Sequence, residues 1–371
     1  MITFSKIKGW VENRIGRKEY ICKVAESAPW VYFSYISYVY DHVNNKEFMA
    51  VHQNRQETVA MVDILNKLGY NVYLQDFTTT KKLPNIHPKI VIGLEPNFCR
   101  ACKKYKEAKK IYFATGAYYK HANRQIISMT DYINNKYNGH VRYKRLTRDH
   151  HANDLADRIL QIGSSYTVKT YPLDIQSKID LIDQSSIGPT IEKEFSPKNE
   201  YFFMASSGNV LKGLSLLLEL FCRHKELTLN VVGPIEDDFS KVMKSVITPN
   251  IKFYGFVNMN SSKMADIVRN CNFVIYPSGT EGGCPGSVIN SMKMGLVPIV
   301  TQWAAFDGIE EVGYIIKDWT VASLEEGLNW SLMLSREQVE VLSKKGQKIV
   351  NSKFTLRRFS EQFEGYIRGL K

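Results

Sequence analysis

Short apolar runs alternate with amphipathic segments along nearly all of the chain. The runs have the length of buried strands, and the segments between them carry apolar residues at helical spacing. Strands that alternate with helices form mostly parallel sheets covered by helices on both faces. The sequence therefore predicts an α/β fold. In the first half, the predicted strands are 31–38, 71–75, 89–94, 109–116 and 158–163, and the predicted helices are 56–69 and 98–110.

A polar segment with Pro189 and Pro197 interrupts this alternation between residues 171 and 198 and is typical of a linker. We therefore expect two Rossmann-like domains, 1–172 and 198–354, joined by a linker over 173–197 and followed by a last helix over 355–371. Ligands of such sheets bind beyond the carboxyl ends of the strands, so two facing domains form one cleft. In the second half, the predicted strands are 200–206, 227–233, 251–256, 272–276 and 297–300, and the predicted helices are 211–224, 238–247, 262–271, 322–334, 336–350 and 355–370.

The composition is that of a soluble globular protein, with 44% hydrophobic and 23% charged residues. No window approaches the roughly 18 uninterrupted apolar residues of a membrane-spanning helix. Residues 1–18 contain neither a continuous apolar core nor a cleavage site of small residues, so no signal peptide is predicted. The expected compartment is the cytoplasm.

Six cysteines are too sparse and irregular for a disulfide framework in a chain of this length. Cys99 and Cys102 form one CxxC, but no second pair stands at zinc-site spacing, so we expect reduced cysteines on a helix. His150, His151 and Asp154 imitate a metal cluster, yet they lack a further ligand nearby. No metal site is predicted.

The positive charge of the chain, a net +12, is concentrated in its first half. Residues 1–197 carry 29 Lys and Arg against 19 Asp and Glu, and within 101–150 the ratio is 12 to 3. A field of one sign suits an anionic membrane surface, a phosphorylated substrate or nucleic acid, although a solvated lysine-rich surface explains it equally. Nucleic acid is not an expected partner, because no RRM, KH or zinc-knuckle signature is present.

Residues 1–18 place apolar side chains, Trp10 among them, on one face of a predicted helix and basic side chains largely elsewhere. Such a helix can lie on an anionic membrane surface, or it can pack onto its own domain. Both interpretations remain open at this stage.

The segment Pro277–Gly295, PSGTEGGCPGSVINSMKMG, is rich in glycine and follows the apolar run NFVIY. Glycines let the backbone approach a ligand closely, and the free amides of the helix that follows attract an anion. The Glu281 carboxylate can accept hydrogen bonds from sugar hydroxyls. Lys212, at the start of the first helix of the second domain, can reach the same cleft. A purely structural crossover has the same pattern in many α/β proteins.

The C-terminal half resembles the retaining glycosyltransferases of the GT-B fold, in particular the large family 4 group. The likeness covers about residues 200–360, whereas the first half matches only in its rhythm of strands and helices. The residues that carry the resemblance are Lys212-Gly213, Gly255 in FYGF, Glu281-Gly282, the run NSMKMG at 290–295 and the run VPIV at 297–300.

The resemblance implies a GT-B fold in which the last helix, 355–371, returns to the N-terminal domain. It also implies a nucleotide-sugar donor as co-substrate, held mostly by the C-terminal domain, with no metal or other cofactor. Glu281 would contact hydroxyls of the donor sugar, amides near 283–287 would hold the diphosphate, and Lys212 would stabilise the charge on the leaving phosphate. The expected donor-binding residues are Gly208, Lys212, Gly255, Phe256, Glu281, Gly282, Gly283, Cys284, Gly286, Ser287 and Asn290.

This sequence departs from the family pattern at two positions. Asn290 replaces a second glutamate that usually binds the ribose, at an interval from Glu281 that is one residue longer than usual. Ser207 stands where an arginine commonly precedes the lysine by five residues. An amide still forms hydrogen bonds to a hydroxyl but without charge assistance, and the loss of one cation weakens a phosphate clamp.

The N-terminal domain should supply the acceptor site. Side chains after two predicted strands are the candidates, with His121 as a catalytic group, although a lone histidine is more often a surface or capping residue. We expect a retaining glycosyltransferase of cell-surface polysaccharide synthesis that acts on a glycan or lipid-linked saccharide, in the cytoplasm or at the inner membrane face. The alternative is an inactive relative that binds nucleotide or sugar. The acceptor-side candidates are His52, Arg55, Thr115, Tyr118 and Arg124.

Overall fold

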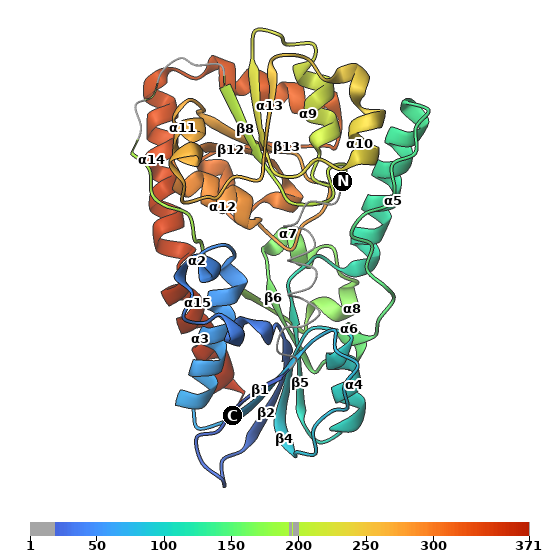
Figure 1. The fold of residues 1–371 in the computed structure, drawn as a ribbon, viewed down its shortest axis with the longest axis vertical. Helices are drawn as coiled ribbons and strands as arrows, with labels where there is room; N and C mark the ends of the chain where they lie inside the picture. Colours follow the sequence, from blue (N-terminus) through green and yellow to red (C-terminus); the bar gives the residue numbers. More distant parts are fainter. Residues whose placement is uncertain (1–18, 193–194, 196–199, 371) are drawn as a thin grey trace.

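The computed structural model describes residues 19–192, 195 and 200–370. Two domains lie one above the other, the N-terminal one in the lower part of Figure 1 and the C-terminal one in the upper part. Each is a mostly parallel β-sheet with helices on both faces, so the predicted α/β architecture is confirmed. The amphipathic pattern at residues 1–18 lies outside the described residues.

The N-terminal sheet has seven strands in the order β1-β3-β2-β4-β5-β6-β7 among the residues described. Neighbours from β3 to β7 are parallel, and only β1 pairs antiparallel, along β3. The sequence did not predict β1. The strands are β1 (Glu19–Cys22), β2 (Trp30–Tyr35), β3 (Asn71–Asp76), β4 (Pro88–Gly93), β5 (Lys109–Ala114), β6 (Arg158–Ile162) and β7 (Ile179–Ile182).

The strand β7 lies inside the range that the sequence assigned to the linker. A run of only four residues, IDLI, with an aspartate inside it does not stand out as a buried strand, but it pairs with β6 at the edge of the sheet. The connection between the domains therefore begins after Ile182, which corrects the predicted linker range of 173–197.

Alternating side chains of the N-terminal strands face two separate cores, as expected for a sheet covered on both sides. Phe33 and Phe113 face one core with α3, whereas Tyr32 and Val91 face the other with α4. The helical segments are η1 (Tyr38–Asp41), α2 (Lys46–Met49), α3 (Gln53–Lys67), α4 (Asn97–Lys104), α5 (Tyr119–Lys136), α6 (Ala152–Leu155), α7 (Ser165–Val168) and α8 (Leu173–Gln176).

In the described part of the chain, the C-terminal sheet has six parallel strands in the order β10-β9-β8-β11-β12-β13, the doubly wound order of a Rossmann domain. Its strands are β8 (Glu200–Met204), β9 (Thr228–Val232), β10 (Ile251–Gly255), β11 (Phe273–Tyr276), β12 (Val297–Thr301) and β13 (Tyr314–Ile316). Its helical segments are α9 (Leu214–Phe221), α10 (Asp237–Val242), η2 (Lys244–Val246), α11 (Ser262–Arg269), α12 (Gly286–Lys293), η3 (Gln302–Ala304), η4 (Ile309–Glu311), α13 (Val321–Met333) and α14 (Arg336–Lys353).

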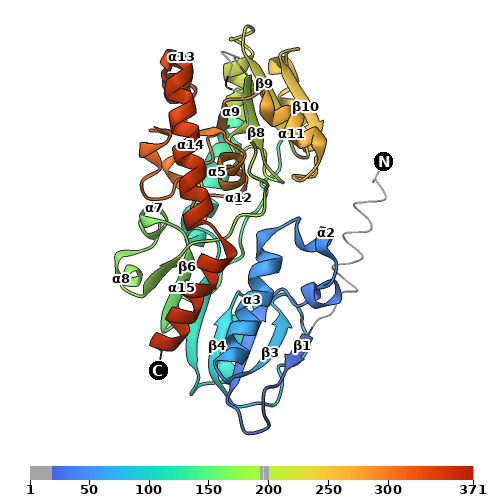
Figure 2. The ribbon, with the colours of Figure 1, turned by 90° about the vertical axis from the view of Figure 1, so that its left-hand side faces the viewer.

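The last helix, α15 (Leu356–Gly369), returns to the N-terminal domain as the sequence predicted. It follows α14 down one side of the molecule and lies beside α3 (Figures 1 and 2). Its apolar stripe, Phe359, Phe363 and Ile367, is completely buried in the N-terminal core. The chain thus crosses between the domains a second time.

Helix α5 also bridges the domains, although the sequence did not predict it. In Figure 1 it rises from the N-terminal domain along the flank of the C-terminal domain. Ile126, Met129 and Ile133 on this helix belong to the hydrophobic core of the C-terminal domain. At its end, Lys136 Nζ lies 2.6 Å from the Glu219 carboxylate, which is almost completely buried on α9. These contacts tie one flank of the molecule together.

The linker is held from both sides by buried polar side chains. From α3, Glu57 Oε1 accepts hydrogen bonds from the Ser185 amide, at 2.6 Å, and from the Ser185 hydroxyl, at 2.8 Å. From α12, Asn290 Oδ1 accepts from the amides of Ile187, at 2.9 Å, and Gly188, at 2.8 Å. Burial raises the pKa of Glu57 to about 7, opposed by the two bonds from Ser185.

We expect Glu57 to make the stability of the protein dependent on pH. Because its pKa is raised in the folded protein, the folded state binds more protons than the unfolded chain between about pH 4.5 and 7. Its contribution is complete below that window and is lost as the pH rises through it. Urea unfolding of Glu57→Gln, which keeps an acceptor oxygen, should show the variant gaining about 2–3 kcal/mol over the wild type between pH 4.5 and 8.

The exposed Glu47→Gln is the matched control, and its free energy of unfolding should follow that of the wild type across this range. If the curves of Glu57→Gln and the wild type run parallel, Glu57 does not titrate between pH 4.5 and 8.

Candidate active site

A cavity of about 460 Å³ lies at the carboxyl ends of the C-terminal strands, where the two domains meet. Met204 at the end of β8, Val232 at the end of β9 and Tyr276 at the end of β11 form its floor. The N-terminal domain contributes the start of α3 and Arg145. The full lining is Ala50, Val51, His52, Gln53, Arg145, Ile187, Met204, Ala205, Ser206, Lys212, Val232, Gly233, Pro234, Phe256, Val257, Asn258, Met259, Tyr276, Pro285, Gly286, Ser287 and Asn290.

A buried ion pair adjoins this cavity. Lys212 Nζ lies 2.5 Å from Glu281 Oε1, and the two side chains are only 6% and 11% exposed. The same oxygen accepts hydrogen bonds from the hydroxyls of Ser278, at 2.7 Å, and Tyr276, at 3.3 Å. Lys212 lines the cavity, and Glu281 lies behind it. The two leading catalytic candidates of the sequence are therefore brought together.

Burial lowers the pKa of Lys212, and the attraction of Glu281 opposes this effect while the positive charge of Arg145 adds to it. A lysine in this position responds strongly to any negative charge that enters the cavity, because the surroundings are poor in water.

The position of Lys212 depends on the glycine after it. Gly213 has φ +80° and precedes α9, and a Cβ there would lie 2.1 Å from the Pro277 carbonyl oxygen. Only glycine allows this turn to pack so closely against the segment that carries Glu281. The close contact with the glycine-rich segment thus explains why a glycine follows Lys212.

The glycine-rich segment divides into two parts with different surroundings. Gly286 and Ser287, in the first turn of α12, line the cavity. Gly282 and Gly283 instead press against the N-terminal domain, since a Cβ on Gly282 would lie 2.4 Å from the Thr115 carbonyl oxygen and one on Gly283 would lie 2.6 Å from the Gly163 Cα atom. Of the residues 283–287 that were expected to hold a diphosphate, Pro285, Gly286 and Ser287 line the cavity, whereas Gly283 and Cys284 do not.

Three of the expected donor residues have other surroundings than predicted. Cys284 is buried in the core, and its carbonyl oxygen accepts a hydrogen bond from Gln184. Gly255, with φ +64°, ends β10, and its carbonyl oxygen accepts from the Gly233 amide at 2.8 Å. Gly208 lies beneath the side chain of Arg145. None of the three is among the cavity-lining residues.

Phe256 and Asn290 line the cavity as expected. The Phe256 ring is 76% exposed, which is unusual for a phenylalanine and leaves a free aromatic face. Asn290 is 1% exposed, and its Oδ1 is already engaged by the linker amides of Ile187 and Gly188. Its amide nitrogen remains the group with which it can contact a ligand.

Of the five predicted acceptor-side residues, only His52 lines the cavity. It caps α3, with its Nδ1 accepting from the Asn54 amide at 3.3 Å, and burial together with Arg55 lowers its pKa. Arg55 turns away, since its guanidinium stacks 3.7 Å above the Phe48 ring. Gln53, which the sequence did not indicate, lies beside His52 in the lining.

His121 and its neighbours lie outside the cavity lining. The His121 ring packs 4.7 Å from the Trp303 ring across the domain boundary, and burial together with Arg124 lowers its pKa. Tyr118 packs on Tyr171. Thr115 contributes its backbone to the contact with Gly282. His121 and Thr115 thus contact the C-terminal domain, whereas Tyr118 packs within its own domain.

The described residues contain no group of three or more His, Cys, Asp or Glu arranged to hold a metal ion. Cys99 and Cys102 are free thiols on α4, and burial raises their pKa values to about 11 and about 12. His151 contacts Asp154 at 3.3 Å on the surface, whereas His150 lies 3.7 Å from Glu95. Within the described part of the chain, no helix is long and apolar enough to cross a membrane.

The comparisons with known proteins agree with this geometry. Residues 199–332 match the family model described as glycosyl transferases group 1. None of the curated proteins matches the sequence significantly. Many solved structures do resemble the chain in three dimensions.

Sucrose-phosphate synthase from Thermosynechococcus elongatus has a TM-score of 0.63 at 11% identity, covering 92% of this chain and 99% of that one. HepE from Anabaena in complex with UDP-glucose has a TM-score of 0.59 at 11% identity, covering 92% and 100%. WaaG, a glycosyltransferase involved in lipopolysaccharide biosynthesis, has a TM-score of 0.53 at 11% identity, covering 90% and 98%. The chain therefore has the GT-B fold of these structures, and its residues 199–332 are similar to the glycosyl transferases group 1.

Proposed function

We propose that the protein is a retaining glycosyltransferase that moves a sugar from a nucleotide-sugar donor to a glycan or a lipid-linked saccharide. The observation that carries this proposal is the buried Lys212–Glu281 pair beside an interdomain cavity that also receives the start of α12. The resemblance to HepE in complex with UDP-glucose supports a donor of this class.

The diphosphate of the donor would lie between Lys212 and the first turn of α12. Amides at a helix start favour an anion, and Lys212 would stabilise the negative charge that develops on the leaving phosphate. The attraction of Glu281 favours the charged form of the ammonium group, and their close contact holds this group in place. These groups supply the positive charge for which other transferases use a metal ion, so we propose a reaction without a metal or other cofactor.

The nucleoside would extend toward Phe256 and Asn290. The exposed Phe256 ring offers a face for stacking on a base, and the amide nitrogen of Asn290 can donate to a ribose hydroxyl. The acceptor would approach from His52 and Gln53 on the opposite wall. The lowered pKa of His52 favours its neutral form, and because its Nδ1 accepts from the Asn54 amide, its Nε2–H can donate a hydrogen bond to an oxygen of the acceptor.

We further propose that the protein works in the cytoplasm, at the inner membrane face, in the synthesis of a cell-surface polysaccharide. The support is the excess of basic residues in 101–150 and the exposed side chains on the outer face of α5. Lys120, Arg124 and the 41% exposed Ile127 line a shallow hollow on that helix, together with two carboxylates, Asp131 and Asp149. Basic and apolar side chains together suit an anionic lipid surface.

A panel of nucleoside diphosphates should identify the donor nucleotide. At least one diphosphate should raise the melting temperature by a few degrees, because a ligand that binds only the folded state stabilises it by mass action. The matching nucleoside, without phosphates, should raise it less. A flat response to the whole panel would contradict the proposed donor site.

Once the donor is known, Glu281→Gln should separate an enzyme from a binding protein. The variant keeps the size and the hydrogen-bonding oxygen of the side chain but removes the charge that pairs with Lys212, so turnover of the donor should fall by about 100-fold or more. Lys212→Met should lower both turnover and affinity for the diphosphate. Chelation of metal ions with EDTA should leave wild-type turnover unchanged.

The exposed Glu310→Gln serves as the control and should keep wild-type turnover. A wild-type protein that binds the nucleotide without hydrolysing or transferring its sugar would favour the inactive binding protein. Equal turnover in Glu281→Gln and the wild type would remove Glu281 from the mechanism.

Flotation with lipid vesicles should test the membrane surface. The full chain should float with vesicles containing phosphatidylglycerol and not with vesicles of phosphatidylcholine alone, and salt should release it. Lys120→Glu should weaken flotation, whereas Lys348→Glu, exposed on α14, should not. Equal flotation of the two variants would show that the α5 face is not the contact.

A further inference from the structure

The segment 139–148, which we call the strap, connects the end of α5 with the rest of the N-terminal domain and lies against the C-terminal domain. The Arg142 guanidinium lies 2.9 Å from the Asp238 carboxylate of α10, and the Arg142 amide donates to the same oxygen. Gly139 approaches so closely that a Cβ there would lie 2.5 Å from a methyl group of Val242.

Two asparagines of α5 fix the shape of the strap. Asn134 pairs with the backbone of Val141, accepting from its amide at 2.6 Å and donating to its carbonyl oxygen at 3.0 Å. Asn123 pairs in the same way with the backbone of Thr147, at 2.9 Å and 2.7 Å. The strap is thus held at both ends, and the residues between these anchors have a defined position.

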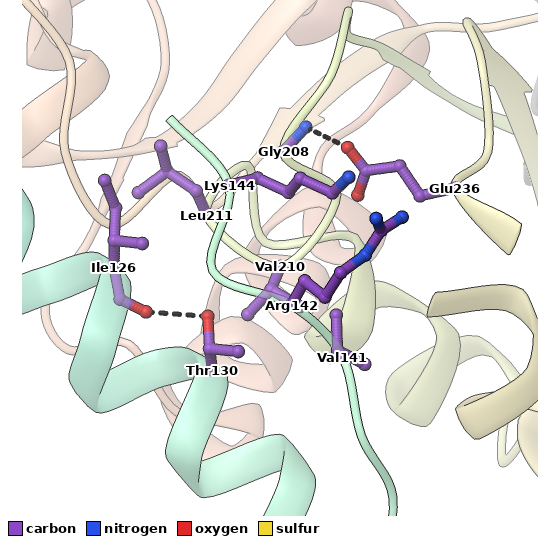
Figure 3. A pocket seen from close by; sticks show the side chains of 9 residues that line it. All are labelled: Ile126, Thr130, Val141, Arg142, Lys144, Gly208, Val210, Leu211 and Glu236. Carbon is purple, nitrogen blue, oxygen red and sulfur yellow. Dashed lines mark hydrogen bonds between the residues drawn. The ribbon is translucent and has the colours of Figure 1, made fainter. Parts of the chain in front are cut away.

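The middle of the strap lies over the loop that follows β8. Figure 3 shows Arg142 and Lys144 of the strap extending toward Glu236, whose carboxylate accepts a hydrogen bond from the Gly208 amide at 2.7 Å. Gly208 has φ +90°, and a Cβ there would lie 2.9 Å from Cδ of Arg145. The absence of a side chain at Gly208 therefore makes room for the stem of Arg145.

Arg145 itself enters the lining of the cavity. Its backbone has φ +67°, a left-handed conformation that costs a non-glycine residue about 1 kcal/mol or more and that is concentrated at functional sites. Among the described residues, no carboxylate lies within ion-pair distance of its guanidinium, and its hydrogen bond is a long one, 3.5 Å to Ser206 Oγ. The strap thus holds an unpaired cation at the cavity.

The charges around the cavity are unbalanced as a result. Arg145 and Lys212 both line it, and no Asp or Glu is among the described lining residues. The one carboxylate in contact with Lys212, that of Glu281, is already engaged. The two cations are close enough for the charge of Arg145 to lower the pKa of Lys212. An anion between them would relieve this repulsion.

We propose that Arg145 binds the diphosphate of the donor together with Lys212, so that the strap of the N-terminal domain completes the phosphate site of the C-terminal domain. This inference rests on the proposed function, because it assigns a residue to the donor of that reaction. A guanidinium is suited to the role, since it binds phosphate oxygens through two parallel hydrogen bonds. It follows that the contact between the domains is a part of donor binding.

Calorimetric titration with UDP, or with the nucleoside diphosphate that the thermal panel selects, tests the proposal, with the matching nucleoside as a second probe. Arg145→Ala should weaken binding of the diphosphate by about 10- to 100-fold and leave binding of the nucleoside unchanged. Arg145→Lys should bind the diphosphate with intermediate affinity, because a lysine keeps the positive charge but cannot form the two parallel hydrogen bonds of a guanidinium. Arg148→Ala, which removes an exposed cation of the same strap, should bind as the wild type.

Asp238→Ala removes the partner of Arg142 without changing a residue of the cavity lining. It should lower the affinity for the diphosphate several-fold, because the strap is displaced. Thermal unfolding of each variant without ligand shows that it is folded. If Arg145→Ala binds the diphosphate like the wild type, or if it loses nucleoside and diphosphate equally, the proposal is wrong. If the wild type binds no nucleoside diphosphate at all, the proposed function fails instead.

Discussion

The buried ion pair of Lys212 and Glu281 is the contact on which the site depends. Removing two charges from water is costly, and here hydrogen bonds from Ser278 and Tyr276 to the same carboxylate oxygen offset part of the cost. The pair joins the turn before α9 to the segment after β11, and Gly213 lets these two backbones touch. The catalytic candidates and the floor of the cavity are therefore positioned by one set of contacts.

The second requirement is the close contact of the two domains. Gly282 and Gly283 pack directly on backbone of the N-terminal domain, three apolar side chains of α5 belong to the C-terminal core, and the linker is bonded to both Glu57 and Asn290. These contacts surround the cavity on several sides. They give the glycine-rich segment two roles, since its start joins the domains and its end, the first turn of α12, lines the cavity.

The sequence predicted what depends on local pattern and family likeness. Apolar runs of strand length predicted most of the two sheets, and the Lys-Gly pair and Glu281 were found from short motifs. The sequence did not predict β1 and β7, because they have four residues each, or α5, because it mixes polar and apolar residues. Packing on neighbouring elements determines their conformation. Nothing in the sequence indicated Arg145, which reaches the cavity through asparagines at positions 123 and 134 and a left-handed backbone. Ser207 of the C-terminal domain stands where the family pattern has an arginine. The arginine that lines the cavity here, Arg145, belongs to the N-terminal domain.

Asn290 bears on whether the site is still active. Its Oδ1 binds two linker amides, so the loss of a glutamate there is explained by a structural task as well as by a change in ligand contact. The stability of the fold does not explain in the same way why Lys212 and Glu281 are present. Replacing a buried ion pair by apolar side chains of similar size often leaves the stability of a protein unchanged or raises it by about 1–4 kcal/mol. Stability alone therefore does not explain this pair or the left-handed arginine beside it. The binding of an anionic ligand that we propose would account for both at one cavity.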